Sequence, residues 1–368
     1  RGERERPATA RREAHHGMAA WQPTAEGLQQ LLGLFKATQG ADNEQHRNIF
    51  EQLRSFNAVP DYNCYLAFIL NQLRQEDTAV RQTAGLVLKN NITQHWASVA
   101  PEVQQFVREN LLGCLGDAVP YIRNTVGSCI TTITMEEGLQ LWPALLPSLY
   151  QMLDSPDQHL FEGAFAALHK ICEDSPDKLA EDVETQPLTF LVPKLLTFFS
   201  HANVHIRTYS VGCINQFVPL MPAALTEHMD AFLHHLFAVA TDPSEEVRKR
   251  VCQALVMLLD VQLEKLMPHM NNVVQYMLMA TTDQNELVAL EACEFWSAIC
   301  ETKVAKQALG DFLPQLVPLL LKGMVYSDED IAVLDQDDED DEAQPDRPED
   351  IKPRFHKNRV VGGGGGGG

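Results

Sequence analysis

The stretch Asp77-Thr-Ala-Val80-Arg81 is the first of six similar windows along the chain, and together these windows decide the fold. Each window has an acidic or polar turn, then a mostly aliphatic residue, usually an arginine, and then an alanine-containing helical stretch. The others are Asp117 to Arg123, Asp157 to Glu162, Asn203 to Arg207, Asp242 to Arg248 and Asp283 to Ala289. Measured at the arginine position, the steps are 42, 39, 45, 41 and 41 residues, about the length of a HEAT-type helix pair. The sequence therefore predicts a solenoid.

The stretch after the first window shows how the second helix of a pair divides into two faces. One face is almost entirely apolar and comprises Val80, Ala84, Val87 and Asn91. Another face carries Gln82, Gly85 and Lys89. We expect the first face to pack and the second to be free for binding. No helix pair alone buries its apolar side, so stability should come from stacking neighbouring pairs.

The first helix of each pair is predicted in the apolar stretch before each window. The expected helices are 142–153, 187–199, 225–240, 266–280 and 309–322. Prolines should end or kink them at Pro147, Pro193, Pro268, Pro314 and Pro318. The predicted fold class is all-α, a right-handed superhelical HEAT-repeat solenoid of about eight antiparallel helix pairs. An acidic disordered loop is expected near its C-terminus.

Cysteine use and hydropathy favour a soluble intracellular protein. The eight cysteines show no CxxC spacing, and five of them recur at corresponding places in successive second helices, so we expect reduced core residues. The recurring five are Cys129, Cys172, Cys213, Cys252 and Cys293. No apolar run approaches the roughly 18 residues of a membrane span, and residues 1–17 lack the apolar stretch of a signal peptide.

The charge of the chain is strongly negative and largely local. A formal charge of −21 argues against direct nucleic-acid binding, which requires a basic surface. Residues 327–350 hold thirteen acids and one basic residue. Seven of the eight residues from Asp335 to Glu342 are acidic, so this segment should not fold alone. Those seven are Asp335, Asp337, Asp338, Glu339, Asp340, Asp341 and Glu342.

A basic segment and seven glycines follow the acids. Lys352, Arg354, Lys357 and Arg359 lie in residues 351–361, and residues 362–368 are all glycine. One interpretation is a solvated linker whose charges keep it soluble. The alternative is an electrostatic device in which the acidic segment competes with a charged partner for one surface of the solenoid. The glycines have no packing role and are not a phosphate-binding loop, because no Lys-Ser/Thr follows them.

Several long strings of residues resemble transportins, nuclear import receptors of the importin-β superfamily. The strings include Gly85-Leu-Val-Leu-Lys-Asn-Asn-Ile92, Glu162-Gly-Ala-Phe, Lys170-Ile-Cys-Glu-Asp-Ser175, Val288-Ala-Leu-Glu-Ala-Cys-Glu-Phe-Trp296 and Pro353-Arg-Phe-His356. The resemblance runs in order from about Trp21 to Val361. It implies that residues 1–17 are an unstructured, non-native leader before an initiating Met18. It also implies HEAT repeats 1–8 over 18–326, with the importin N-terminal region at about 49–117, and an eighth-repeat loop over 327–361.

The resemblance also implies a mechanism and partners. Transportins bind Ran-GTP through their N-terminal half and, through their C-terminal half, cargo with a proline-tyrosine nuclear localisation signal. They carry cargo past nucleoporin repeats, shuttling between cytoplasm and nucleus. An acidic loop in the eighth repeat couples the two sites, so Ran-GTP releases cargo. The chain stops inside that loop, so the cargo-binding half is expected to be absent.

Carried onto this sequence, the family's Ran contacts come from the concave second helices of the first four repeats and from repeats seven and eight. The candidates are Gln82, Lys89, Asn90, Asn124, Lys170, Glu286, Glu329 and Asp330. Each could equally be a solvated polar position. The acids could instead stabilise helix N-termini.

Other functional classes find less support in the residues. His228, His234 and His235 share one helical region without nearby Cys or Glu at metal spacing, so no metal site is expected, and no cofactor either. No nucleophile, base and oxyanion donor are placed together, so the chain is not expected to be an enzyme. A HEAT scaffold subunit of a phosphatase-like complex remains the alternative, although it gives no reason for the acidic insertion after Tyr326.

Overall fold

A computed structural model describes residues 21–324, and within that range every regular element is an α-helix or a short 3-10 helix. The chain forms two compact units. The first extends to Ala305, and the second begins at Lys306. The candidates Glu329 and Asp330, the acidic residues 335–342, the leader and the terminal glycines all lie outside the described residues.

The predicted windows lead directly into the second helices of the pairs. Within the described residues the six that follow a window are α4 (Thr78–His95), α6 (Pro120–Glu137), α8 (Gln158–Asp174), α11 (Val204–Phe217), α14 (Glu245–Val261) and α17 (Glu286–Glu301). The second helix of the first pair, α2 (Asn43–Ser55), has no predicted window before it. Polar side chains of the windows cap several of them. Asp77 accepts a hydrogen bond from Ala79 N, and Asp157 accepts from His159 N. Such caps satisfy backbone donors that have no partner in the helix.

The first helices are shorter than predicted, and several are broken. Their bounds are α1 (Ala25–Thr38), α3 (Tyr62–Asn71), α5 (Pro101–Cys114), α7 (Leu145–Met152), α9 (Pro176–Glu181), α10 (Leu188–Thr197), α12 (Ala223–Glu227), α13 (Met229–Ala238), α15 (Leu263–Leu266), α16 (Met270–Ala280), α18 (Ala305–Leu309) and α19 (Leu313–Gly323). The predicted helix 266–280 divides at the 3-10 turn Met267–His269, which contains Pro268. By contrast, Pro193 lies inside the continuous helix α10. Proline therefore predicted only some of the breaks.

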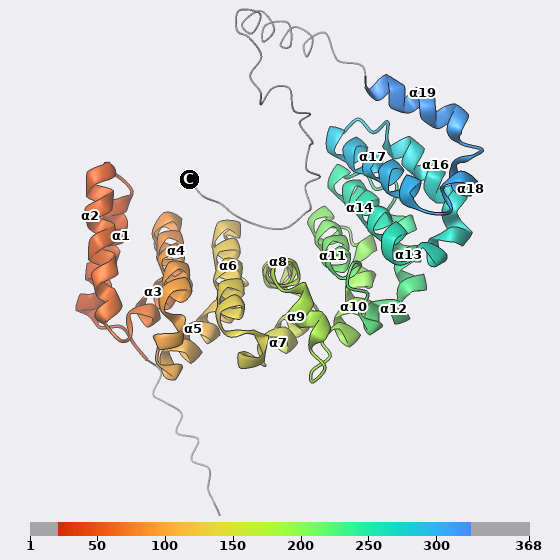
Figure 1. Cartoon of the computed structure of the whole chain (residues 1–368). Coiled ribbons are helices and arrows are strands. Elements are labelled where there is room, and N and C mark those ends of the chain that lie inside the picture. The colour runs from red at the N-terminus through yellow and green to blue at the C-terminus, as the bar shows by residue number, and fades with distance from the viewer. Residues whose placement is uncertain (1–20, 325–368) are drawn as a thin grey trace, which may run out of the picture. The chain divides into compact units, whose positions relative to one another are not determined.

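In the first unit, the second helices form one layer and the first helices another (Figure 1). Within the layer of second helices, α4 packs on α6, α6 on α8, α8 on α11, α11 on α14, and α14 on α17. The core lies between the layers and includes the fully buried Phe165, Phe199 and Phe217. Stacking of like elements, rather than closure around one centre, buries the apolar faces.

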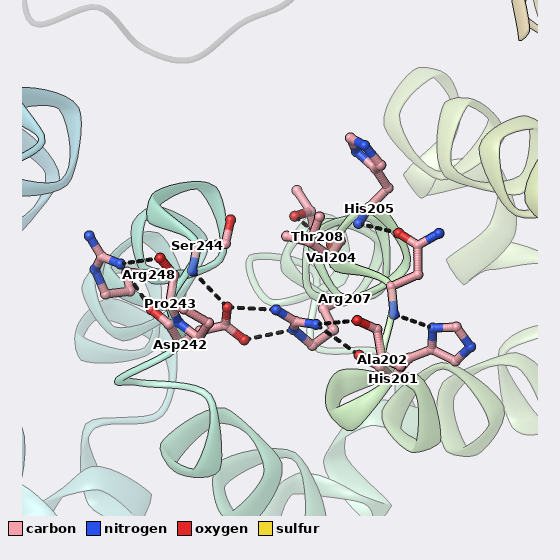
Figure 2. A network of polar contacts seen from close by, with 11 residues as sticks. His201, Ala202, Val204, His205, Arg207, Thr208, Asp242, Pro243, Ser244 and Arg248 are labelled. Carbon is pink, nitrogen blue, oxygen red and sulfur yellow. Dashed lines mark hydrogen bonds and ion pairs between the residues drawn. The ribbon is translucent and has the colours of Figure 1, made fainter.

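The arginines of the windows link successive repeats, and we call the series the arginine ladder. Arg207 Nε and Nη2 donate to the two carboxylate oxygens of Asp242 in the next window, at 2.7 and 2.8 Å (Figure 2). Arg248 makes the same two bonds to Asp283, at 2.7 and 2.9 Å. Arg81 pairs with Asp117 of the next window through Nη2 alone, and its Nε and Nη2 also donate to the carbonyl of Leu70. Each bidentate pair fixes the separation and rotation of two neighbouring turns.

The ladder changes at the fourth repeat, where Glu162 stands in place of the arginine that the windows before and after it carry. The carboxylate of Glu162 accepts from Arg123 Nη2 at 3.0 Å on one side and from Asn203 Nδ2 at 3.2 Å on the other. Arg123 also donates to the carbonyl of Asp117 at 2.7 Å. Hydrogen bonds therefore still link the third, fourth and fifth repeats, but at position 162 the linking side chain is an acid instead of an arginine.

The ladder should make stability depend on pH. The hydrogen bond from Arg248 holds the pKa of Asp283 below its usual range. A carboxyl with a lowered folded-state pKa stabilises the fold above its unfolded pKa, about 4, and loses that contribution as pH falls through the folded value. We expect Asp283→Asn to lower the free energy of unfolding at pH 7 by about 2 kcal/mol. Chemical denaturation at pH 7 and pH 3 should show a smaller acid loss in Asp283→Asn than in the parent, and equal acid losses would contradict this assignment.

Candidate partner-binding surface of the second helices

The packing face predicted for α4 is confirmed, whereas the free face needs one correction. Val80 and Ala84 are fully buried, and Asn91 is buried with its amide donating to Asn63 Oδ1 at 3.0 Å. Gly85, however, is buried rather than free: a Cβ at this position would lie 2.6 Å from Thr125 Cγ2 on α6. Gly85 is therefore a point where α4 and α6 approach closely, and it is not part of a binding surface.

Five of the predicted contact residues lie on three adjacent second helices. On α4, Asn90 is exposed and Gln82 and Lys89 are half-buried. Asn124 is exposed on α6, and Lys170 is half-buried on α8. Because α4 packs on α6 and α6 on α8, these side chains belong to neighbouring parts of one layer. Within the described residues, the Lys89 side chain makes no hydrogen bond or ion pair, so it is available to a partner.

Glu286 does not join this group. It is exposed in the first turn of α17, which is separated from α8 by α11 and α14 along the layer. Asn285 caps that helix by accepting from Leu287 N at 3.0 Å. A carboxylate in the first turn also interacts favourably with the helix dipole. The local role that the sequence left open for Glu286 is therefore consistent with its position.

The recurring cysteines are mostly core residues, as predicted, with one exception. Cys129, Cys172, Cys213 and Cys252 are fully buried, whereas Cys293 on α17 is exposed. Burial raises the pKa of the Cys129 thiol to about 12, despite the opposing charge of nearby Lys89. Burial likewise raises the pKa of Cys213 and Cys252, so these three thiols are protonated and unreactive at neutral pH. The recurrence of cysteine placed Cys293 on a second helix correctly, but it could not show whether the residue lies on the buried or the exposed side of α17.

The described part of the chain contains no metal-ligand cluster and no membrane-spanning helix. Between residues 21 and 324 there is no cluster of three or more His, Cys, Asp or Glu side chains arranged to hold a metal ion. No helix in that range is long and apolar enough to cross a membrane. A cavity of about 250 Å³ lies among Tyr62, Asn63, Asn91 and His95, where helix α4 ends.

Two family models match the chain. One is described as the importin-beta N-terminal domain and covers residues 50–117, and the other as IPO5-like, TPR repeats and covers residues 121–276. Together they span much of the first unit. The first match agrees with the importin N-terminal region expected at about 49–117.

Relatives give a more specific result. The chain is 48% identical over 341 residues to transportin-1 of Mus musculus, an alignment covering 93% of this chain and 38% of the relative. It is 43% identical to transportin of Dictyostelium discoideum, covering 95% and 37%. It is 30% identical to importin subunit beta-2 of Saccharomyces cerevisiae, covering 94% and 40%. The chain thus spans well under half the length of these relatives.

Solved structures of low sequence identity share the fold. Yeast importin-beta (Kap95p) superposes with a TM-score of 0.61 at 17% identity, covering 80% of this chain and 36% of that chain. Kap121p bound to RanGTP gives a TM-score of 0.59 at 18% identity, covering 78% and 27%. These scores confirm the HEAT-repeat solenoid. The matched models and the relatives define the class: the chain belongs to the importin-β family. Within that family the chain is transportin-like.

Proposed function

We propose that this chain is the Ran-GTP-binding part of a transportin-like nuclear import receptor. The observation that carries the proposal is the group of available polar side chains on α4, α6 and α8 in a chain 48% identical to transportin-1. Lys89 and Asn90 belong to α4 and Asn124 to α6, two helices that pack on one another. A structure of Kap121p bound to RanGTP, with the same fold, supports the choice of partner.

The remaining steps of the import cycle form the finer part of the proposal. In the whole receptor, cargo with a proline-tyrosine signal binds to later repeats, and the acidic residues 335–342 couple Ran-GTP arrival to cargo release. Nucleoporin repeats are a further partner, and a complex of Kap95 with Nup1 supports this expectation. The receptor would shuttle between cytoplasm and nucleus. The phosphatase scaffold finds no support among these relatives, and the proposal assigns no reaction to the chain.

Nucleotide selectivity tests the proposal directly. We expect the chain to bind Ran loaded with a non-hydrolysable GTP analogue at least about tenfold more tightly than Ran-GDP, a difference of about 1.4 kcal/mol. Raising salt should slow association more than it speeds dissociation, because charge steers the encounter. Surface plasmon resonance measures both rates. Equal affinities for the two nucleotide forms would overturn the assignment.

A further inference from the structure

The cavity of about 250 Å³ beside the C-terminal end of α4 lies at the end of that helix farther from the arginine ladder. Its walls come from two successive connections between repeats, the one that joins α2 to α3 and the one that joins α4 to α5. The first turn of α3 and the last turns of α4 also line it. The volume is several times the roughly 30 Å³ share of one molecule of liquid water, so the cavity has room for a side chain.

Two buried asparagines of this cavity form an amide pair whose hydrogen bonding is incomplete. Asn63 on α3 is 8% exposed and Asn91 on α4 is 7% exposed, and Asn91 Nδ2 donates to Asn63 Oδ1 at 3.0 Å. Among the described residues, Nδ2 of Asn63 and Oδ1 of Asn91 make no hydrogen bond, and neither atom is shut off from solvent. The pair therefore keeps one free donor and one free acceptor, on two side chains that line the same cavity. Polar groups of side chains this deeply buried normally have partners, and a ligand could supply them here.

Tyr62 contributes a wall of the cavity rather than a polar contact. Its ring stacks on Phe56, with the ring centroids 5.7 Å apart. Its hydroxyl has no hydrogen-bond partner in the described part of the chain, but that oxygen is closed to solvent. The groups that can receive a ligand are therefore the free atoms of the asparagine pair.

The lining of the cavity favours an uncharged ligand. No Asp, Glu, Lys or Arg side chain lines it, and His95 lines it from an exposed position. Asp61, the acid nearest in sequence to Asn63, accepts from Trp21 Nε1 at 2.9 Å and is not among the lining residues. A charged ligand would lose hydration in this cavity without gaining a fixed opposite charge.

The free donor and acceptor narrow the ligand further. A carboxylate only accepts and would leave the oxygen of Asn91 unpaired, whereas an ammonium only donates and would leave the nitrogen of Asn63 unpaired. A hydroxyl can do both, but from a single oxygen, while the free atoms belong to two different side chains. A trans peptide group directs its N–H and C=O to opposite sides. A primary amide carries its donor and its acceptor on neighbouring atoms and matches the pair best.

We propose that this cavity binds the primary amide of a glutamine or asparagine side chain from a protein partner. The carbonyl oxygen of the ligand accepts from Asn63 Nδ2, and its NH2 group donates to Asn91 Oδ1. Its methylene groups lie against the apolar part of the wall, to which Val59 and Val99 contribute. The proposal does not rest on GTPase binding, because no residue that lines the cavity is a proposed Ran contact.

The test uses four short peptides, acetyl-Ala-X-Ala-N-methylamide, in which X is glutamine, methionine, glutamate or serine. The methylamide ensures that no terminal primary amide imitates the ligand. Titrations of the full chain followed by saturation-transfer-difference NMR give the dissociation constants. Asn63→Asp replaces the free donor by an acceptor and keeps the oxygen to which Asn91 donates. Val59→Trp places a large ring at the cavity from a position that is 41% exposed. Asn272→Asp and Val183→Trp are the matched controls, at exposed positions that do not line the cavity.

We expect the glutamine peptide to bind the parent about tenfold more tightly than the other three, because each of those lacks one or both of the amide's hydrogen bonds. Asn63→Asp and Val59→Trp should each weaken its binding by about fivefold or more, and the controls by no more than about twofold. If Asn63→Asp lowers the melting temperature, Val59→Trp, a change at an exposed position, carries the comparison. Three results would overturn the site: equal binding of the glutamine and methionine or serine peptides, unchanged binding in both cavity variants, or equal losses in the controls.

Discussion

Val80→Asp should destabilise the first unit by about 3–5 kcal/mol, the range expected for an uncompensated buried charge. Val80 is fully buried, and it opens the packing face of α4. The new carboxyl would either remain charged in an apolar environment or take up a proton at a free-energy cost. Because α4 packs on both α3 and α6, the loss should spread to the neighbouring repeats. Urea unfolding followed by circular dichroism measures the stability, and hydrogen exchange shows which helices open.

A matched control for Val80→Asp lies on the same helix. Leu86 is 47% exposed, so Leu86→Asp introduces the same charge where water can solvate it. We expect its stability to remain within about 0.5 kcal/mol of the parent. Similar losses in the two variants would mean that the charge itself, rather than burial at Val80, causes the effect.

Gly163→Ala should also destabilise the protein, by up to about 2 kcal/mol, although alanine is the better helix former. A Cβ at Gly163 in α8 would lie 2.0 Å from the carbonyl oxygen of Leu115, which caps the C-terminus of α5. A backbone carbonyl cannot rotate away as a flexible side chain can, so α8 would have to move from α5 and strain the Arg123–Glu162 pair. The cost of overpacking, about 1–3 kcal/mol or more against backbone, should exceed the gain in helix propensity of about 1 kcal/mol.

Gly33→Ala is the same substitution at an uncrowded position, and it should have the opposite effect on stability. Gly33 lies in α1, and no atom lies within 4 Å of its would-be Cβ. This change should raise the free energy of unfolding by up to about 1 kcal/mol, because only the helix-propensity term remains. If both glycine variants proved stabilising, the close approach at Leu115 would be wrong.

The helices that pack along the chain were predictable because their signals are local and repeated. Polar caps such as Asp77 and Asp157 precede apolar stretches at steps of 39 to 45 residues, and the second helices begin at those caps. Burial at Val80 and Ala84 followed from the helical period. A period describes which residues share a face, so it predicted the packing side of α4 correctly.

Contacts between repeats were not predictable, because no single helix contains them. Gly85 falls on the same helical face as Lys89, yet it is buried by Thr125 of the next repeat. The break near Pro268 and the continuity of α10 through Pro193 depend on what packs against each helix. The acidic partners of the ladder arginines lie 35 to 39 residues away, and only their repetition in the windows could have suggested them.

The candidate partner-binding surface could be predicted from the sequence only in part. Lys89, Asn90 and Asn124 were chosen for their helical face and for the resemblance, and the structure leaves each of them accessible to solvent. The close approach of His169 and Arg250 over Gly212 was not predicted, because these three residues come from three repeats. Its one local signal was a glycine in the middle of α11, which in a helix implies close approach of a neighbouring group.

The most direct test of the proposed division of α4 into packing and partner faces is the effect of Lys89→Glu on Ran-GTP binding and on stability. Among the described residues Lys89 has no acidic partner to lose, so we expect the free energy of unfolding to stay within about 0.5 kcal/mol of the parent. Affinity for Ran-GTP should fall by about tenfold, because the charge facing the partner is reversed. Lys178→Glu on α9, exposed and outside the second helices, should leave it unchanged. Early unfolding of Lys89→Glu, or binding of Ran-GTP as tight as the parent's, would contradict the account.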